Sequence, residues 1–183
     1  NKRSNIKPKL IKYRNVSPSI STYNIKSVNF LRILLFIPMH IIKAELQHVP
    51  DLIPLFDGYR IFYRQTSDYV KAKTFLTNRI QNQESIIYIA YDDENAIGFT
   101  QLYPLFSSVS MQPMFLLNDL YVEDNYRSQG IGNLLIDKVK QLCKTLNYKG
   151  VAIQTANTNP AQHLYERLGF VKDPDLHFFW KNT

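Results

Sequence analysis

The chain has 183 residues, 45% of them hydrophobic and 13% aromatic, which is enough apolar material for one buried core and too much for a disordered protein. Its net charge of +7 is uneven, because residues 1–38 hold eight of the 22 lysines and arginines and none of the 15 acids. The rest of the chain is close to neutral, whereas a nucleic-acid groove needs its basic excess on the folded domain. The composition therefore predicts no nucleic-acid partner.

Residues 1–38 differ from the rest in composition. They are rich in Asn, Lys and Ser and follow no hydrophobic period, whereas strand-like alternation begins at Met39. We expect residues 1–38 to be a disordered or non-native N-terminal extension and residues 39–183 to form one domain. An acid-free, basic stretch also fits an organelle targeting segment, and that alternative stays open. The apolar run ending at Pro38 is far shorter than the roughly 20 residues of a membrane span, so we expect no membrane partner and a cytoplasmic location.

The first elements after Met39 are predicted to be a strand and two helices. Residues 41–46 alternate as in a strand, and residues 48–63 have the spacing of a helix with one apolar stripe, formed by Leu52, Leu55, Phe56 and Tyr59. A second helix is expected over residues 67–81 with Ser67 as its N-cap. Its inward face is predicted to consist of Val70, Phe75, Leu76 and Ile80.

The remaining elements continue an α/β order without repeats. Three strands are expected first, at residues 85–92, 96–106 and 115–122. The turns between them favour an antiparallel meander. We then expect a long helix at residues 131–146 and a strand at residues 150–155. A short helix at residues 159–170 and a last aromatic strand around residues 177–180 complete the order.

Cysteine and histidine give no sign of a metal site or a disulfide. Cys143 is the single cysteine and has the spacing of a core-facing helical residue, so we interpret it as a small buried apolar side chain. The four histidines form neither an HExxH motif nor a pair spaced for zinc. The sequence therefore predicts no bound metal.

The stretch NYRSQGIGNLL, residues 125–135, has the chemistry of an anion site. A strand that enters a Gly-rich turn and then a helix presents free amides at the positive end of the helix dipole. Gly130 and Gly132 lack the Cβ atoms that would keep a phosphate from the backbone, and Arg127 can add a charge-assisted contact. Leu135 stands where a dinucleotide fingerprint needs glycine, and no Gly-Lys-Ser/Thr follows as in a P-loop. Taken without the rest of the sequence, the two glycines are also explained by a simple cap of a turn.

The loop is part of a larger pattern. The motif R-x-x-G-x-G follows the strand residues LYV and precedes NPAQHLYERLGF by some 30 residues. In this combination the chain resembles the GNAT superfamily of acetyl-CoA-dependent N-acetyltransferases over about residues 40–180. The resemblance implies a mixed, mostly antiparallel α/β (α+β) sheet of about six to seven strands, with about four helices on its two faces.

The resemblance also implies how the co-substrate acetyl-CoA is held. The pyrophosphate would lie on the loop, which comprises Arg127, Ser128, Gln129, Gly130, Ile131 and Gly132, and the pantetheine arm would run along Leu120, Tyr121 and Val122. Asn157 and Asn159 would contact the cofactor, although an Asx cap of the following helix explains them equally well.

Two residues are candidates for proton transfer. Tyr165 matches the tyrosine that many relatives use as general acid; its alternative is a core aromatic at helical spacing. The acids that relatives use as base are replaced by Gln154 and Asn118, which leaves Asp119 and Glu123 as the local carboxylates. We take Asp119 as the candidate base, with a solvated strand-end charge as the alternative for either acid.

Two functions are compatible with these residues. The leading hypothesis is direct transfer of an acetyl group, in a ternary complex, to a primary amine on a small molecule or a protein lysine. The other is a non-catalytic acyl-CoA-binding sensor or scaffold, which the missing glutamates suggest. A homodimer is compatible with the sequence.

Overall fold

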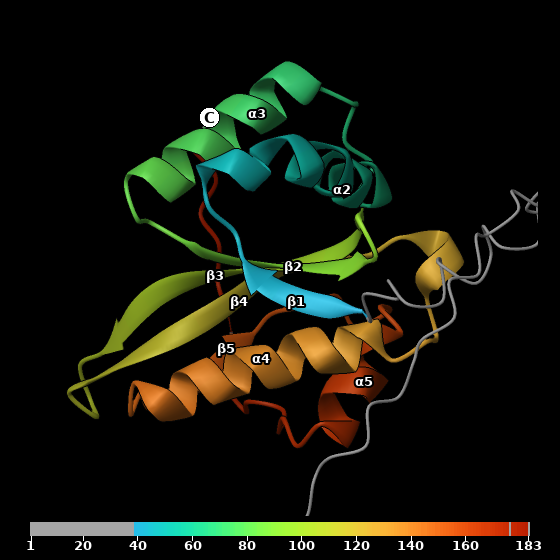
Figure 1. Cartoon of the computed structure of the whole chain (residues 1–183). Helices are drawn as coiled ribbons and strands as arrows, with labels where there is room; N and C mark the ends of the chain where they lie inside the picture. Colours follow the sequence, from blue (N-terminus) through green and yellow to red (C-terminus); the bar gives the residue numbers. More distant parts are fainter. Residues whose placement is uncertain (1–38, 176, 183) are drawn as a thin grey trace, which may run out of the picture. The chain divides into compact units, whose positions relative to one another are not determined.

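The computed structural model describes residues 39–175 and 177–182, so the predicted extension at residues 1–38 lies outside the described part of the chain. Five strands are present there: β1 (His40–Lys43), β2 (Ile86–Asp92), β3 (Asn95–Ser107), β4 (Gln112–Val122) and β5 (Val151–Ile153). They form one sheet in sequence order (Figure 1). The pairs from β1 to β4 are antiparallel, and β5 pairs with β4 in parallel. The mixed, mostly antiparallel sheet is confirmed, but six to seven strands were too many.

The missing strand is the aromatic one expected around residues 177–180. No strand is assigned there, and Phe178, Phe179 and Trp180 are each more than 80% exposed. Aromatic composition favours a strand only where a paired and half-buried surface receives it. In the described structure β5 is three residues long and offers little such surface.

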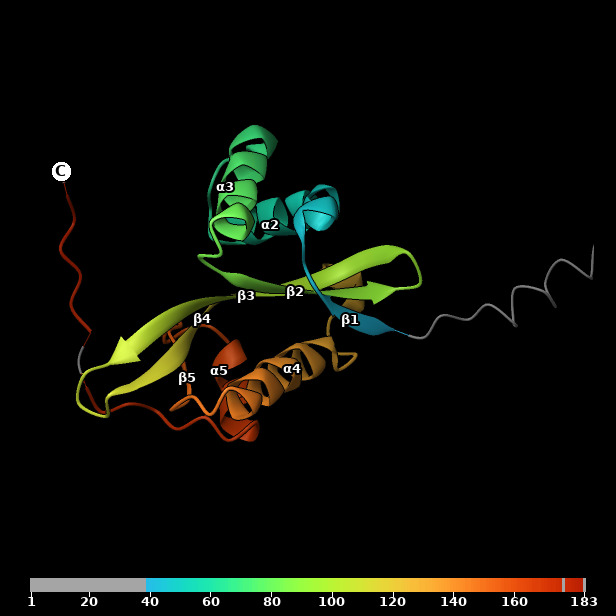
Figure 2. The ribbon, with the colours of Figure 1, turned by 60° about the vertical axis from the view of Figure 1, so that its left-hand side comes forward.

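Four α-helices cover the two faces of the sheet in the described residues. Two lie on one face, α2 (Val49–Phe62) and α3 (Tyr69–Gln81), and two on the other, α4 (Ile131–Thr145) and α5 (Ala161–Arg167) (Figures 1 and 2). Two 3₁₀ turns are also present in the described residues, η1 (Leu46–His48) and η2 (Asp124–Tyr126). Four helices on both faces agree with the sequence prediction.

Each face of the sheet has its own apolar core. Side chains of β2 alternate between them: Ile87 and Ile89 pack under α2 and α3, whereas Tyr88 and Ala90 pack against the α4 side. All four are less than 10% exposed. A strand buried on both faces reads as a continuous apolar run, which is how residues 86–91 appear in the sequence.

The start of α3 differs from the prediction. Asp68 rather than Ser67 is the N-cap, and its carboxylate accepts a hydrogen bond from the Lys71 amide at 2.9 Å. Ser67 instead donates to Asp57 of α2 at 2.7 Å, and the Asp68 amide donates to the same carboxylate. The buried Asp57 therefore ties the two helices together.

The inward face of α3 was predicted in part. Leu76 is fully buried, and Phe75 and Ile80 are partly buried against the core, whereas Val70 is 77% exposed. Val70 lies six residues before Leu76, a separation that places the two side chains on different sides of an α-helix. Ala72 is buried instead, at 1% exposure, so the inward face includes Ala72 and not Val70.

One irregularity of β4 positions the functional site. Gln101 pairs with Asp119 and Leu102 with Leu117, so Asn118 is an extra residue opposite β3. Such a bulge bends the strand. On the other edge of β4, pairing with β5 ends at Leu117 opposite Ile153. In the described chain, Asn118–Val122 therefore have a strand partner on one side only.

Candidate active site

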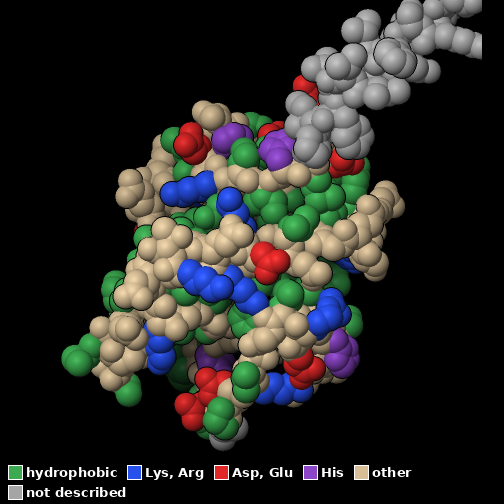
Figure 3. Space-filling view, turned by 60° about the horizontal axis from the view of Figure 1, so that its bottom comes forward, with side chains coloured by type: hydrophobic (Ala, Val, Ile, Leu, Met, Phe, Trp, Pro, Cys, Tyr) green, Lys and Arg blue, Asp and Glu red, His purple; other side chains and the backbone are tan. Residues whose placement is uncertain are grey.

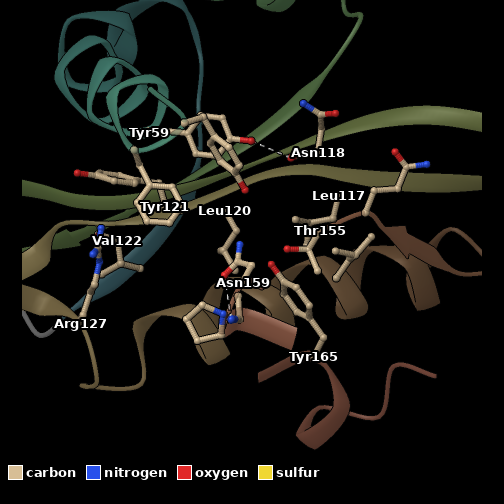
Figure 4. A pocket seen from close by; sticks show the side chains of 16 residues that line it. Tyr59, Leu117, Asn118, Leu120, Tyr121, Val122, Arg127, Thr155, Asn159 and Tyr165 are labelled. Atoms are coloured by element: carbon tan, nitrogen blue, oxygen red, sulfur yellow. Dashed lines mark hydrogen bonds between the residues drawn. The ribbon is translucent and has the colours of Figure 1, made fainter. Parts of the chain in front are cut away.

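A cavity of about 230 Å³ opens where β4 and β5 separate. Its walls come from α2, β4, the end of β5 with the loop that follows, and α5 (Figure 4). The lining residues are Tyr59, Phe62, Tyr63, Leu117, Asn118, Leu120, Tyr121, Val122, Arg127, Ile153, Gln154, Thr155, Asn159, Pro160, Ala161 and Tyr165. The cavity thus brings together residues that are more than 100 positions apart.

The unpaired edge of β4 forms one wall. Leu120, Tyr121 and Val122, which the resemblance assigns to the pantetheine arm, all line the cavity. Buried backbone amides and carbonyls require hydrogen-bond partners, and an extended ligand can supply them along a free strand edge. This wall can hold an elongated polar chain through its backbone.

Tyr121 reaches its place because α2 carries a glycine opposite it. A Cβ atom on Gly58 would lie 2.6 Å from the Tyr121 hydroxyl oxygen and 3.0 Å from the adjacent ring carbon. Any larger residue at position 58 would push the ring or the helix away. Gly58 therefore sets the distance between α2 and β4 beside the cavity.

The predicted phosphate loop leads from β4 to α4. Gly130 is the N-cap of α4 and has φ of 86°, a left-handed conformation that glycine adopts without steric cost. No side chain of the described residues caps this end, and the first turn of α4 holds no acid. Its amides and the positive end of the dipole are available to an anion. Residues 128–132 lie outside the cavity lining, next in sequence to Arg127, which belongs to it.

Arg127 is held in place by several contacts. Its Nε donates to the Val122 carbonyl at 3.0 Å, and its guanidinium pairs with Asp124 at 2.6 Å. The same group lies 5.8 Å from the Phe62 ring and 5.7 Å from the Tyr121 ring. These contacts present a positive charge at the edge of the cavity.

The wall formed by the loop after β5 contains polar groups, and only some of them have a hydrogen-bond partner among the described residues. The Thr155 hydroxyl is buried and has no hydrogen-bond partner among the described residues. Asn159 lines the cavity while its side chain accepts from the Ala161 amide at 3.0 Å, which is the Asx contact considered as its alternative. Asn157 is outside the lining, and its carbonyl accepts from Gln162. A buried hydroxyl without a partner is a natural contact for a polar ligand.

Tyr165 projects from α5 into the cavity (Figure 4). Burial, with a smaller effect of Tyr63, raises the pKa of its phenol to about 12. The hydroxyl therefore carries its proton throughout the neutral range, as a general acid must. Its ring also contacts Phe170 edge-on at 6.0 Å, so part of the core role considered for it is present as well.

Asp119 is 3% exposed and lies outside the cavity lining. Burial raises the pKa of its carboxyl above the ordinary value, and the Tyr59 phenol and the Asn118 amide near it oppose the rise. The Asn118 amide donates to this carboxylate at 3.0 Å. The alternative of a solvated strand-end charge is therefore wrong for Asp119. The second local acid, Glu123, is outside the cavity lining.

Sequence reasoning missed the aromatic wall. Tyr59, Phe62 and Tyr63 come from the last turn of α2 and its C-cap. Tyr59 was assigned to the helical core stripe, and its ring does pack on Phe99 at 6.1 Å. Only the change from Leu and Phe to Tyr along that stripe could have indicated a polar end facing a cavity.

The described residues hold no group of three or more His, Cys, Asp or Glu that could bind a metal ion. Within the same residues, none of the helices is both long and apolar enough to cross a membrane. On the face shown in Figure 3, the Lys and Arg side chains lie among acidic and neutral ones instead of forming one basic surface.

A strand whose free edge lines the cavity, followed by a Gly-rich loop and a helix, is the arrangement that the resemblance to the GNAT superfamily predicts, and comparison with known proteins agrees. Residues 83–172 match the family model of the acetyltransferase (GNAT) domain. The chain is 43% identical to the uncharacterized N-acetyltransferase YhfO of Bacillus subtilis over 79% of its own length and 98% of that protein. It is 32% identical to a probable acetyltransferase of Haemophilus influenzae, over 77% and 96%.

A solved structure, described as a probable acetyltransferase, superposes with a TM-score of 0.73 at 35% identity, over 79% of this chain and 97% of that one. The chain belongs to the GNAT superfamily, and it is an N-acetyltransferase.

Proposed function

We propose that the domain formed by residues 39–183 transfers the acetyl group of acetyl-CoA to a primary amine by direct attack within a ternary complex. The observation that carries the proposal is the free edge of β4 at Asn118–Val122, which lines a cavity and leads to the uncapped start of α4. This arrangement offers a strand edge for an extended arm and helix amides for a phosphate.

The residues present fit this co-substrate. The backbone of Leu120–Val122 would bind the pantetheine arm, and the segment from Arg127 to Gly132 would bind the pyrophosphate. The unpartnered Thr155 hydroxyl and the Asn159 side chain lie on the opposite wall and can contact the same arm. Asn157 remains a weaker candidate because it is outside the cavity lining.

Acetyl-CoA supplies the activated acyl group, and the chain supplies position, charge stabilisation and proton transfer. A β4 amide directed at the thioester oxygen would stabilise the charge that develops there, and losing such a donor costs about 3 kcal/mol. Tyr165 would protonate the departing thiolate, since its raised pKa keeps it in the acid form.

The acceptor must reach the site without its proton. Deprotonating a lysine-like amine of pKa about 10.4 at pH 7 costs about 4.6 kcal/mol, so the site needs a base. Asp119 is the candidate base, and its burial requires that the proton reach it through an intermediate group. The proposed acceptor is a primary amine, either on a small molecule or on a protein lysine.

A cysteine nucleophile for a covalent acetyl-enzyme is absent from the described residues that line the cavity. Cys143 belongs to α4, is buried in the core and is outside the cavity lining. Burial raises the pKa of its thiol, whereas a nucleophilic cysteine needs a lowered one. These facts support direct transfer.

The test is turnover of acetyl-CoA with a panel of polyamines, amino acids and lysine peptides, with release of the free thiol as the signal. Calorimetry with coenzyme A gives binding separately. Thiol release that requires one class of amine supports the proposal. Tight coenzyme A binding without transfer to any amine would overturn it in favour of an acyl-CoA sensor.

A further inference from the structure

The carboxylate of Asp119 lies behind the cavity wall. It is 3% exposed and is absent from the cavity lining, so an acceptor amine in the cavity does not touch it. A base in this position works only through a group that contacts both the cavity and the carboxylate. Two neighbours lie at the wall beside it, Tyr59 and Asn118.

Tyr59 has the geometry of such a connecting group. It lines the cavity from α2, and its hydroxyl oxygen lies 3.3 Å from the Asn118 carbonyl oxygen (Figure 4). This hydroxyl is also close enough to the Asp119 carboxylate for the negative charge there to raise the pKa of the phenol. Its ring is fixed edge-on against Phe99 at 6.1 Å and against Tyr63 at 5.0 Å. The hydroxyl is thereby held between the cavity and the buried acid.

Asn118 is less suited to this task. Its side-chain amide donates to Asp119 at 3.0 Å, and an amide neither accepts nor releases a proton readily at neutral pH. It can orient the carboxylate. A phenol, in contrast, can accept a proton on its oxygen while it gives up its own.

The charged and titratable groups around the pair come from four elements. Tyr59 and Tyr63 belong to α2 and its cap, Tyr103 to β3, Asp119 to β4 and Tyr165 to α5. Arg79 and Glu84 act on Tyr103 rather than on Asp119. Burial and then the charge of Asp119 raise the pKa of Tyr59 far above its ordinary value, so the phenol stays protonated and acts as the donor.

We propose that Tyr59 relays the acceptor's proton to Asp119. One proton leaves the ammonium nitrogen for the Tyr59 oxygen while the phenolic proton moves to an Asp119 carboxylate oxygen. The products are a neutral amine, an intact phenol and a neutral carboxylic acid, so the charges balance. This inference rests on the proposed acetyl transfer, and it makes Tyr59 a catalytic residue that the motifs did not indicate.

The relay predicts a characteristic dependence on pH. Asp119 must be ionised to accept the proton, so kcat/KM of the wild type should rise through the raised pKa of this carboxyl and then level off. Without the relay, only the neutral fraction of the amine in solution reacts. The rate should then rise about tenfold per pH unit up to the pKa of the amine, near 10.4 for a lysine-like acceptor.

The first experiment compares pH profiles with the best amine from the panel. Tyr59→Phe and Asp119→Asn should each lower kcat/KM about 100-fold at pH 7, convert the plateau to a continuous rise and leave coenzyme A affinity unchanged. The double variant should be no slower than the slower single one, because the two groups act as a unit. Tyr103→Phe is the matched control, since it also removes a hydroxyl near Asp119 but is outside the cavity lining. An unchanged profile in folded Tyr59→Phe would overturn the relay.

The second experiment needs no acceptor. In protein labelled with ¹³C at the aspartate carboxyls, the pKa of Asp119 is measured by NMR. Tyr59→Phe should raise it, because the phenol near this carboxyl lowers its pKa, whereas Tyr103→Phe should not change it. No shift in Tyr59→Phe would overturn the relay while leaving acetyl transfer intact. A wild type that acetylates no amine would instead overturn the proposed function, and the relay with it.

Discussion

Two segments of β4 have opposite roles although they adjoin in one strand. Phe115–Leu117 pair with β3 on one edge and with β5 on the other, and the Phe115 and Leu117 side chains are each 2% exposed. Asn118–Val122 pair with β3 alone, and four of these five residues line the cavity. In the first segment both backbone edges are paired, and Leu117 at its end is the one member that also reaches the cavity lining. The second keeps one backbone edge available, and that edge is where the candidate site lies.

The same comparison explains why the site begins at the bulge. The extra residue Asn118 changes the register against β3 at the position where pairing with β5 stops. Beyond it, the buried carboxylate of Asp119 accepts a hydrogen bond from the Asn118 side chain at 3.0 Å. A single bulge therefore ends the structural part of the strand and starts the functional part.

The largest expected effect comes from the anion loop that extends the functional segment. Gly130→Val should abolish coenzyme A binding, because a β-branched residue is strained at φ of 86° and shields the helix amides. Calorimetry measures the affinity. Gly169→Val is the matched control, since Gly169 has φ of 83° and equally open surroundings outside the cavity lining. Equal affinities in two folded variants would contradict the loop assignment.

Tyr165→Phe should have the next largest effect. It removes only the hydroxyl that faces the functional segment across the cavity, and loss of a general acid slows a reaction by about 100- to 10,000-fold. Affinity for coenzyme A should hardly change. Steady-state kinetics and calorimetry on the same sample separate the two quantities. An unaltered kcat would return Tyr165 to a purely structural role against Phe170.

A mutation in the structural segment should produce the reverse pattern. Phe115→Ala removes a fully buried side chain outside the cavity lining and should lower the free energy of unfolding by about 3–5 kcal/mol. Because its backbone pairing with β5 is retained, coenzyme A affinity of the folded protein should stay within about twofold. Chemical denaturation gives the first value and calorimetry below the transition gives the second. A large loss of affinity at unchanged stability would mean that the two segments are not distinct.

The sequence predicted the elements around the candidate site better than it predicted where the two segments of β4 meet. The strand, the loop and α4 follow from local patterns, namely alternation, glycine placement and apolar spacing, and all three are present. The sequence carries no local signal for the bulge at Asn118 or for the early end of β5. Both depend on pairing between residues distant in the chain, and β-structure is decided by such context.

Two further errors have the same origin. Asp68 replaced Ser67 as the cap of α3 because Ser67 was needed at Asp57, ten residues earlier. Tyr59 looked like any core residue of an amphipathic helix, since periodicity reports which face is buried but not what its polar end meets. The motif-based residues Leu120–Val122, Arg127 and Tyr165 all line the cavity, whereas Ser128–Gly132 and Asn157 lie outside its lining.

Cys143→Ser should have the smallest effect on catalysis and therefore sharpens the comparison. Cys143 packs in the same core cluster as Phe115 and Leu117, behind the structural segment, and its sulfur contacts the Tyr148 carbonyl at 3.8 Å. A serine oxygen in place of the sulfur would be too far from that carbonyl for a hydrogen bond, so unfolding should become easier by about 1–3 kcal/mol, the cost of burying a hydroxyl without a partner. Turnover should stay within a few-fold, and mass spectrometry of the enzyme mixed with acetyl-CoA should show no acetylated cysteine. An inactive but folded Cys143→Ser protein would require a covalent mechanism and would move chemistry into the segment that we assign to stability.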